Sequence, residues 1–147
     1  MAWVMKDVPS LKCFAHGGRQ VRTEAKYGHV YDDFTVEYEY AGGIRTTAMC
    51  REMPDCKQKV SERIVGTKGV AHCASGRIEG EKPYEYAGPA VNPCVQEHVD
   101  LIRSIRSGDP VNEGQRMAES NLTAIMGRLS AYTGLPVNWD WAAKEST

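Results

Sequence analysis

Two adjacent glycines followed by an arginine, Gly17-Gly18-Arg19, form the most suggestive polar segment of the chain. Glycine after a strand permits either a bulge or a close approach of the backbone to a ligand. The guanidinium of Arg19 carries a planar fork of donors that suits a carboxylate, a phosphate or the neighbouring hydroxyls of a sugar. The segment therefore predicts Arg19 as a substrate-binding residue. A surface bulge with a solvated arginine is the alternative interpretation.

Three further residues could complete such a site. Tyr27 and His29 lie two positions apart, so an aromatic face and a general acid or base could stand beside a sugar ring. Without a recognisable partner, His29 could equally be an ordinary loop histidine. Arg51 ends a predicted strand, where it could face a ligand or form an ion pair near Glu52. The candidate substrate-binding residues are Arg19, Tyr27, His29 and Arg51.

The glycine spacing argues against a dinucleotide site in this chain. Such a site needs two glycines separated by a single residue, because the backbone must turn tightly and approach the pyrophosphate. No two of the 14 glycines are spaced in this way. The segment Gly-Thr-Lys-Gly at residues 66–69 lacks the residue order of a phosphate-binding P-loop and predicts a simple turn. We therefore expect no cofactor-binding residue here.

Metal and thiol chemistry are not indicated either. The five cysteines include no Cys-x-x-Cys pair and the four histidines are dispersed, which predicts reduced thiols and no metal site. Nothing in the sequence places a base beside Cys50, so a thiolate nucleophile is not expected. We predict no catalytic residue in this chain.

Charge and hydropathy exclude further classes. A net charge of −1 gives no electrostatic footprint for nucleic acid or for an anionic membrane. The apolar runs are too short to span a bilayer, and the first residues lack the pattern of a signal peptide. The expected location is cytoplasmic.

The first ninety residues predict strands. Residues 30–40 alternate with a period of two, which is typical of a half-buried strand. Ala41-Gly42-Gly43 then supplies a turn, and residues 44–51 resume as its hairpin partner. Further strands are expected at 11–16, 59–65, 70–73, 77–79 and 84–86, with turns at 66–69 and 75–76.

Two amphipathic helices are predicted in the last third. Asn92-Pro93 opens the first with a good N-cap and a preorganised first turn, and Gly108 to Pro110 ends it. The second opens near Asn112, which with Gln115 resembles a capping box, and it stops at Gly134. Its expected buried stripe is Ala118, Leu122, Ile125, Leu129 and Tyr132. The first helix should bury Val95, His98, Val99, Ile102 and Ile105, with His98 as a core histidine.

Strands followed by helices indicate an α+β class: a mainly antiparallel open sheet with two C-terminal helices packed on one face. The other face must be solvated or covered by a partner. Tyr31 and Met49 on that nominal outer face mildly favour a subunit interface. A glycine within the second helix, Gly127, is explained if that helix packs closely on the sheet.

Several blocks of sequence, in order, resemble the C-terminal domain of the glucose–fructose oxidoreductase / inositol dehydrogenase / MocA-like family, and most closely its bacterial sugar-dehydrogenase branch. The resemblance covers nearly the whole chain. It is specific for the family and not for a substrate. The blocks are Gly-Gly-Arg-Gln-Val-Arg at 17–22, Tyr-Asp-Asp-Phe-Thr-Val-Glu-Tyr-Glu-Tyr at 31–40, Met-Cys-Arg at 49–51, Val-Gly-Thr-Lys-Gly at 65–69, Asn-Pro-Cys-Val-Gln-Glu-His-Val-Asp-Leu-Ile at 92–102, and the helical run at 112–134.

The resemblance implies that residues 1–147 are a single C-terminal domain for substrate binding and oligomerisation, and that an N-terminal Rossmann domain is absent from this chain. In the family that Rossmann domain binds NAD or NADP and carries the glycine fingerprint, the lysine and the catalytic pair. None of those residues has a matching position here. NAD or NADP is thus expected only in the full-length protein. The expected partners are the chain's own Rossmann domain, a second copy at the open sheet face, and a sugar or polyol.

Three functions remain open at this point. The first is the C-terminal domain of an NAD(P)-dependent sugar or polyol oxidoreductase, inactive as an isolated fragment. The second is a stand-alone sheet module for binding or scaffolding, which dimerises through its open face. The third is part of a lyase or glycosidase-like enzyme that uses bound NAD transiently. The upstream reading frame and product analysis on keto-sugars and glycosides would separate them.

Overall fold

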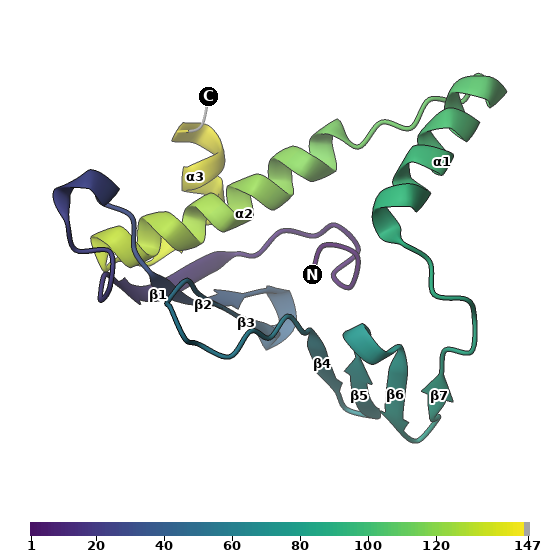
Figure 1. The fold of residues 1–147 in the computed structure, drawn as a ribbon, viewed down its shortest axis with the longest axis horizontal. Helices are drawn as coiled ribbons and strands as arrows, with labels where there is room; N and C mark the ends of the chain where they lie inside the picture. The colour runs from purple at the N-terminus through teal and green to yellow at the C-terminus, as the bar shows by residue number, and fades with distance from the viewer. Residues whose placement is uncertain (146–147) are drawn as a thin grey trace. The chain divides into compact units, whose positions relative to one another are not determined.

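The computed structural model describes residues 1–145, which divide into two compact units (Figure 1). The first unit joins residues 1–56 to the chain from residue 112 onward, and the second comprises residues 57–111. Each unit contains one four-stranded sheet, and all strand pairs are antiparallel. The α+β class and the antiparallel pairing are confirmed, although the strands form two sheets and not one.

The sheet of the first unit contains the predicted hairpin. Its strand order is β3 (Arg45–Arg51), β2 (Asp33–Glu39), β1 (Lys12–Gly18) and β8 (Val137–Asn138). The short 3-10 helix η2 (Ala41–Gly43) connects β2 to β3, where the Tyr40 N–H donates to the Ile44 carbonyl at 2.8 Å. The two turn glycines both have a φ of 75°, a conformation that favours glycine.

The core of the first unit lies between this sheet and the long helix α2 (Gly114–Thr133), which lies over the sheet in Figure 1. The alternation predicted for β2 is confirmed, because Val36, Tyr38 and Tyr40 are buried while Thr35 and Glu37 are exposed. The short helix α3 (Trp139–Glu145) closes one end. The buried apolar residues are Cys13, Ala15, Val36, Tyr38, Tyr40, Met126, Val137 and Ala142.

The helix α2 presents a different face to the sheet from the one predicted. Met126, Gly127 and Ser130 are buried, whereas Ile125 is 49% and Leu129 is 36% exposed. Of the other predicted members, Leu122 and Tyr132 are half-buried and Ala118 is exposed. The physical reason is size: small residues let the helix approach the strands closely, so the packing face follows Gly127 and Ser130 and not the bulkiest apolar stripe.

Gly127 confirms that close approach. A Cβ atom on this residue would lie 2.7 Å from the hydroxyl oxygen of Tyr38 and 3.0 Å from a methyl of Val36. The first distance is shorter than real Cβ atoms show and the second is unusually tight, so a larger residue would have to displace Tyr38 or move the helix. The hydroxyl of Tyr38 in turn donates to the Thr123 carbonyl at 3.0 Å, which ties β2 to α2.

The second unit contains the short strands β4 (Arg63–Gly66), β5 (Gly69–His72), β6 (Arg77–Gly80) and β7 (Tyr84–Glu85), paired in that order. The predicted turns at 66–69 and 75–76 are confirmed, the latter at the end of the 3-10 helix η3 (Cys73–Ser75), where Gly76 is left-handed. The helix α1 (Pro93–Ser107) also belongs to this unit. None of the helices in residues 1–145 combines the length and apolarity that crossing a membrane requires.

The ends of α1 are as predicted, but its burial is not. The Asn92 side chain accepts from the Cys94 N–H at 2.9 Å, and Gly108 ends the helix in a left-handed conformation. The stripe expected in the core is exposed, with Ile105 at 69% and Val95 at 60%. His98, expected as a core residue, is also exposed, and its ring lies 3.5 Å from the Glu97 carboxylate. Amphipathic spacing indicates that a face can be covered, not what covers it.

The start of α2 also differs from the prediction. The N-cap residue is Glu113, and the Asn112 side chain accepts from the Gly114 N–H at 3.1 Å in a turn ahead of the helix. Gln115 donates to Glu119 and not back to the cap, so the expected capping box does not form.

Candidate functional site

A closed loop joins β1 to β2 and carries three of the four predicted site residues. It comprises residues 19–31, and we call it the 19–31 loop. The two strands that it connects come together at its base, where the Asp32 N–H donates to the Gly18 carbonyl at 2.7 Å. The 3-10 helix η1 (Ala25–Tyr27) lies at its middle. Compact surface loops whose ends meet in this way are frequently functional.

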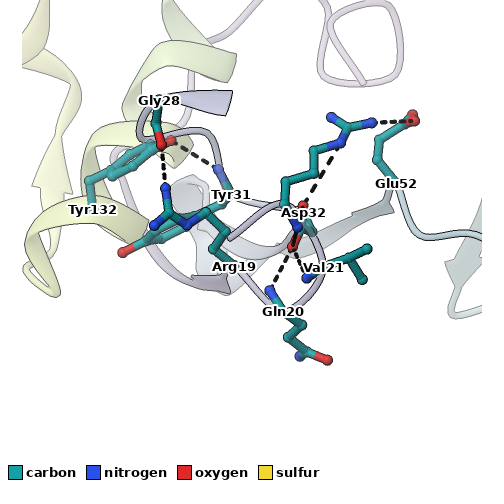
Figure 2. Close-up of polar contacts among 9 residues, drawn as sticks. Arg19, Gln20, Val21, Gly28, Tyr31, Asp32, Glu52 and Tyr132 are labelled. Carbon is teal, nitrogen blue, oxygen red and sulfur yellow. Dashed lines mark hydrogen bonds and ion pairs between the residues drawn. The ribbon is translucent and has the colours of Figure 1, made fainter. Parts of the chain in front are cut away.

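A buried carboxylate holds the first part of this loop. Asp32 is 1% exposed, and its Oδ2 accepts from the N–H groups of Gln20 and Val21, each at 2.6 Å (Figure 2). The Arg22 N–H completes the set at 3.2 Å, and its Nε lies 4.0 Å from the carboxylate. Three successive N–H groups thus form an anion-binding nest that the chain fills with its own side chain.

The environment of Asp32 favours the charged carboxylate. Burial by itself raises the pKa of this group, but the N–H donors of Val21, Arg22 and Gln20 and the charge of Arg22 together outweigh burial and lower the pKa below its usual value. A carboxylate with a lowered pKa stabilises the fold above the pKa of the unfolded chain, and that contribution is lost as the pH falls through the folded value.

We therefore expect the stability difference between the wild type and Asp32→Asn to depend on pH. The wild type should melt at a higher temperature at pH 6, and the gap should narrow as the pH falls below about 3.8, the ordinary pKa of an aspartate. Melting curves of both proteins from pH 6 to pH 2.5 measure this. A gap of constant size across that range would contradict the assignment.

The second part of the loop is held by α2. The Tyr132 hydroxyl donates to the His29 carbonyl at 2.5 Å and accepts from the Tyr31 N–H at 3.2 Å. The rings of Tyr31 and Tyr132 stack with centroids 4.2 Å apart. Across the loop, Arg19 Nη1 donates to the Gly28 carbonyl (Figure 2). Both parts of the loop are therefore fixed to the body of the first unit.

Neither glycine before the loop forms a bulge, and Gly17 is required by packing. The pairing of β1 with β2 is continuous through Gly17 and Gly18. A Cβ atom at Gly17 would lie 2.6 Å from the Asp33 carbonyl oxygen and 2.9 Å from the ring of Tyr31. Glycine is thus required at residue 17 so that the tyrosine can lie against the strand.

The structure brings Arg19, Tyr27 and His29 together on one loop, with Tyr27 40% exposed and His29 exposed. Arg51 lies at the same end of the sheet, paired across β3 and β2 with Asp33, on the face opposite to α2. Within residues 1–145 the Arg51 side chain has no hydrogen bond or ion pair, so the ion pair considered for Arg51 is wrong. Arg22 makes that contact instead, 3.8 Å from the Glu52 carboxylate.

Asp32 and Tyr132 are the residues that the sequence reasoning missed. Asp32 has the same even-numbered spacing as the buried residues Val36 and Tyr38. An acidic residue at such a position is unusual, and this pattern could have identified Asp32 from the sequence. Tyr132 was predicted only as a buried helix residue. The hydrogen bonds of its hydroxyl were not predictable, because their partners lie more than 100 residues away in the chain.

No metal site is evident in the part of the chain that the structure describes. Nowhere in residues 1–145 do three His, Cys, Asp or Glu side chains group in a way that could hold a metal ion. A pocket of about 170 Å³ lies between the N-terminal segment and the start of α2, where Arg116 binds Asp7 through two contacts of 3.1 Å. Ligand pockets usually measure roughly 300–1,000 Å³, so this one is too small for a dinucleotide.

The thiols differ sharply in their surroundings. Cys13 is buried under α2, and burial raises its pKa to about 11 despite a hydrogen bond with the backbone of Val137. We expect Cys50, Cys73 and Cys94, which are exposed, to react quickly with a thiol-specific disulfide reagent at pH 8. Cys13 should react only after unfolding. Mass spectrometry of the labelled native chain checks this, and rapid labelling of Cys13 would contradict the packing described.

Comparisons with known proteins place this fold. It is similar to a protein from Thermotoga maritima described as an oxidoreductase, with a TM-score of 0.68 and 18% identity over 93% of this chain and 42% of that one. It is also similar to the WlbA dehydrogenase of Bordetella pertussis, solved with NADH and UDP-GlcNAcA, with a TM-score of 0.61 and 18% identity over 88% of this chain and 39% of that one. No protein-family model and no curated protein sequence matches.

The fold is therefore one that occurs as a domain of oxidoreductase chains. The chain spans about two fifths of the length of both solved proteins.

Proposed function

We propose that this chain is the substrate-binding and oligomerisation domain of an NAD(P)-dependent sugar or polyol oxidoreductase, and that it is catalytically silent without a cofactor domain. The observation that carries the proposal is the fold match, which covers nearly all of this chain but only about two fifths of each oxidoreductase chain. NAD as the cofactor class is supported by WlbA, which was solved with NADH.

The substrate side of the proposal rests on the 19–31 loop. The loop offers the guanidinium of Arg19, the ring of Tyr27 and the imidazole of His29 at one end of the sheet, and the side chain of Arg51 makes no polar contact among the described residues. Cationic and aromatic groups of these kinds bind the hydroxyls and the apolar faces of sugars.

The oligomer side rests on the sheet face opposite α2. On this face Met49 is 76% and Phe14 is 40% exposed, whereas Tyr31, predicted for the same face, stacks on Tyr132 of α2. Two uncovered apolar side chains, on β1 and β3 of an open sheet, suit a second copy of the chain. Sedimentation should then show a dimer that Met49→Lys weakens, and a strictly monomeric wild type would count against this part.

Calorimetry with NADH tests the central claim. The 147-residue chain should give no heat of binding at cofactor concentrations up to the millimolar range, because its glycines do not form a pyrophosphate-binding turn. Binding in the micromolar range would contradict the proposal. The reading frame upstream should encode a Gly-x-Gly-x-x-Gly segment, and its absence would favour a stand-alone module.

Arg19→Ala should weaken substrate binding in the enzyme that carries this domain. Loss of charged hydrogen bonds to a sugar should raise KM by about tenfold. Arg103→Ala is the matched control, since it makes the same chemical change at an exposed arginine of α1 that pairs with Asp100. Steady-state kinetics of the two variants checks the difference. Equal kinetics for Arg19→Ala and the wild type would remove Arg19 from the site.

A further inference from the structure

We propose that Asp32 is the positioning residue of the 19–31 loop, acting on substrate through Arg19, and that the Tyr132 hydroxyl holds the other part of the same loop. Substrate binding by the loop rests on the proposed function, but the contacts that hold the loop in place do not. Neither residue is among the candidate contacts. Both act on the backbone from which those contacts project.

The side-chain hydrogen bonds of Asp32 all go to backbone N–H groups of the 19–31 loop. One carboxylate oxygen takes the N–H groups of Gln20 and Val21 at 2.6 Å, directly after Arg19 in the chain. Charge-assisted bonds of this length are among the strongest that a side chain makes to the backbone. They fix the peptide that carries the Arg19 side chain, which then reaches the Gly28 carbonyl across the loop.

The backbone of Asp32 is bound separately from its side chain. Its N–H donates to Gly18 and its carbonyl accepts from the Glu52 N–H, both at 2.7 Å, and a substitution of the side chain leaves these bonds in place. A variant can therefore release the loop while the sheet stays paired. This separates positioning from a general role in folding.

The second clamp is independent of the first. The Tyr132 hydroxyl binds the His29 carbonyl and the Tyr31 N–H, while its ring stacks on Tyr31 and also contacts Arg128. Tyr132→Phe would keep the ring contacts and remove only the two hydrogen bonds. Two trypsin sites report on the clamps: Arg22 lies at the first clamp, and Lys26 lies between the two.

Limited trypsin digestion of the 147-residue chain tests the clamps directly. Asp32→Asn keeps one acceptor oxygen but removes the negative charge and places an NH2 donor where the second carboxylate oxygen faces the N–H and guanidinium donors of Arg22. Cleavage after Arg22 should therefore accelerate by about tenfold. Tyr132→Phe should accelerate cleavage after Lys26. The control is Asp33→Asn, which makes the same chemical change one residue later, at a carboxylate with no hydrogen bond to the loop.

Melting curves confirm that each variant is folded at the digestion temperature. Amide hydrogen exchange at Gln20, Val21 and Arg22 measures the same loop opening without a protease. It can therefore be used even if Asp32→Asn lowers the stability of the whole domain. Faster exchange at these three amides than in Asp33→Asn supports the proposal. Equal cleavage and exchange in the two variants would overturn it.

Kinetics of the enzyme that carries the domain tests the action through Arg19. Asp32→Asn and Arg19→Ala should each raise KM by about tenfold while kcat changes little, and the double variant should be no worse than either single one. Additive effects would overturn the action through Arg19. If the enzyme has no sugar activity, the proposed function fails, and the digestion result still decides whether Asp32 positions the loop.

Discussion

Replacing Gly127 with leucine is expected to lower the free energy of unfolding by about 3 kcal/mol. A Cβ atom at this position already lies within 2.7 Å of the Tyr38 hydroxyl oxygen and 3.0 Å of Val36, so a larger side chain must push α2 away from β2. Helix propensity acts in the opposite direction, since leucine in a helix is favoured over glycine by roughly 0.8 kcal/mol. Steric displacement of the helix outweighs that gain.

Ala124→Leu provides the matched control for this substitution. Ala124 lies on the same helix one turn earlier and is exposed, so the added side chain projects into solvent. Its effect should stay within about 0.5 kcal/mol. Thermal unfolding of the two variants measures the difference, which corresponds to about 10 °C in Tm. A stabilised Gly127→Leu variant would show that α2 does not pack on the sheet at this distance.

The fold was predictable where a local pattern decides it. The alternation from Val36 to Tyr40 identifies a half-buried strand, and Gly42 and Gly43 locate its turn, because period and turn chemistry act within a few residues. The caps of α1 at Asn92 and Gly108 were equally readable. These features depend on the chain's immediate neighbours and on nothing distant.

Features that depend on distant partners were not predictable. The face of α2 was misplaced because an apolar stripe through Ile125 and Leu129 has the right spacing, while the true face is chosen by how closely Gly127 and Ser130 fit the strands. The exposure of Ile105 in α1 shows the same limit, since spacing does not name a partner.

The candidate site follows the same division. The glycines before Arg19 point to the loop that carries Arg19, Tyr27 and His29, and substrate binding by these residues stays a prediction. The residues that hold the loop were missed because their hydrogen bonds go to backbone groups. Every residue has such groups, so the residue types in the sequence do not indicate these bonds. Asp32 was easier to predict than Tyr132. An acid at a buried position of the alternating pattern needs hydrogen-bond donors, and so it indicates an ordered loop nearby.

Ser130 joins α2, β1 and the turn after α2 through one hydroxyl group. It is fully buried, accepts from the Ala15 N–H at 2.9 Å and donates to the Leu135 carbonyl at 2.7 Å. Ser130→Ala would leave a buried N–H and a carbonyl without their partner. Because a buried polar group without a hydrogen bond costs about 1–3 kcal/mol, we expect a loss of about 2 kcal/mol in the free energy of unfolding.

Ser120→Ala makes the same chemical change at an exposed position of the same helix. It should be neutral or slightly stabilising, since alanine is the better helix former by a few tenths of a kcal/mol. Urea denaturation of both variants gives the comparison, and unchanged m-values would show that the denatured state is the same. If Ser130→Ala lowered the free energy of unfolding by less than about 0.5 kcal/mol, another group would have replaced the hydroxyl as hydrogen-bond partner. The packing of α2 on the sheet would then not depend on Ser130.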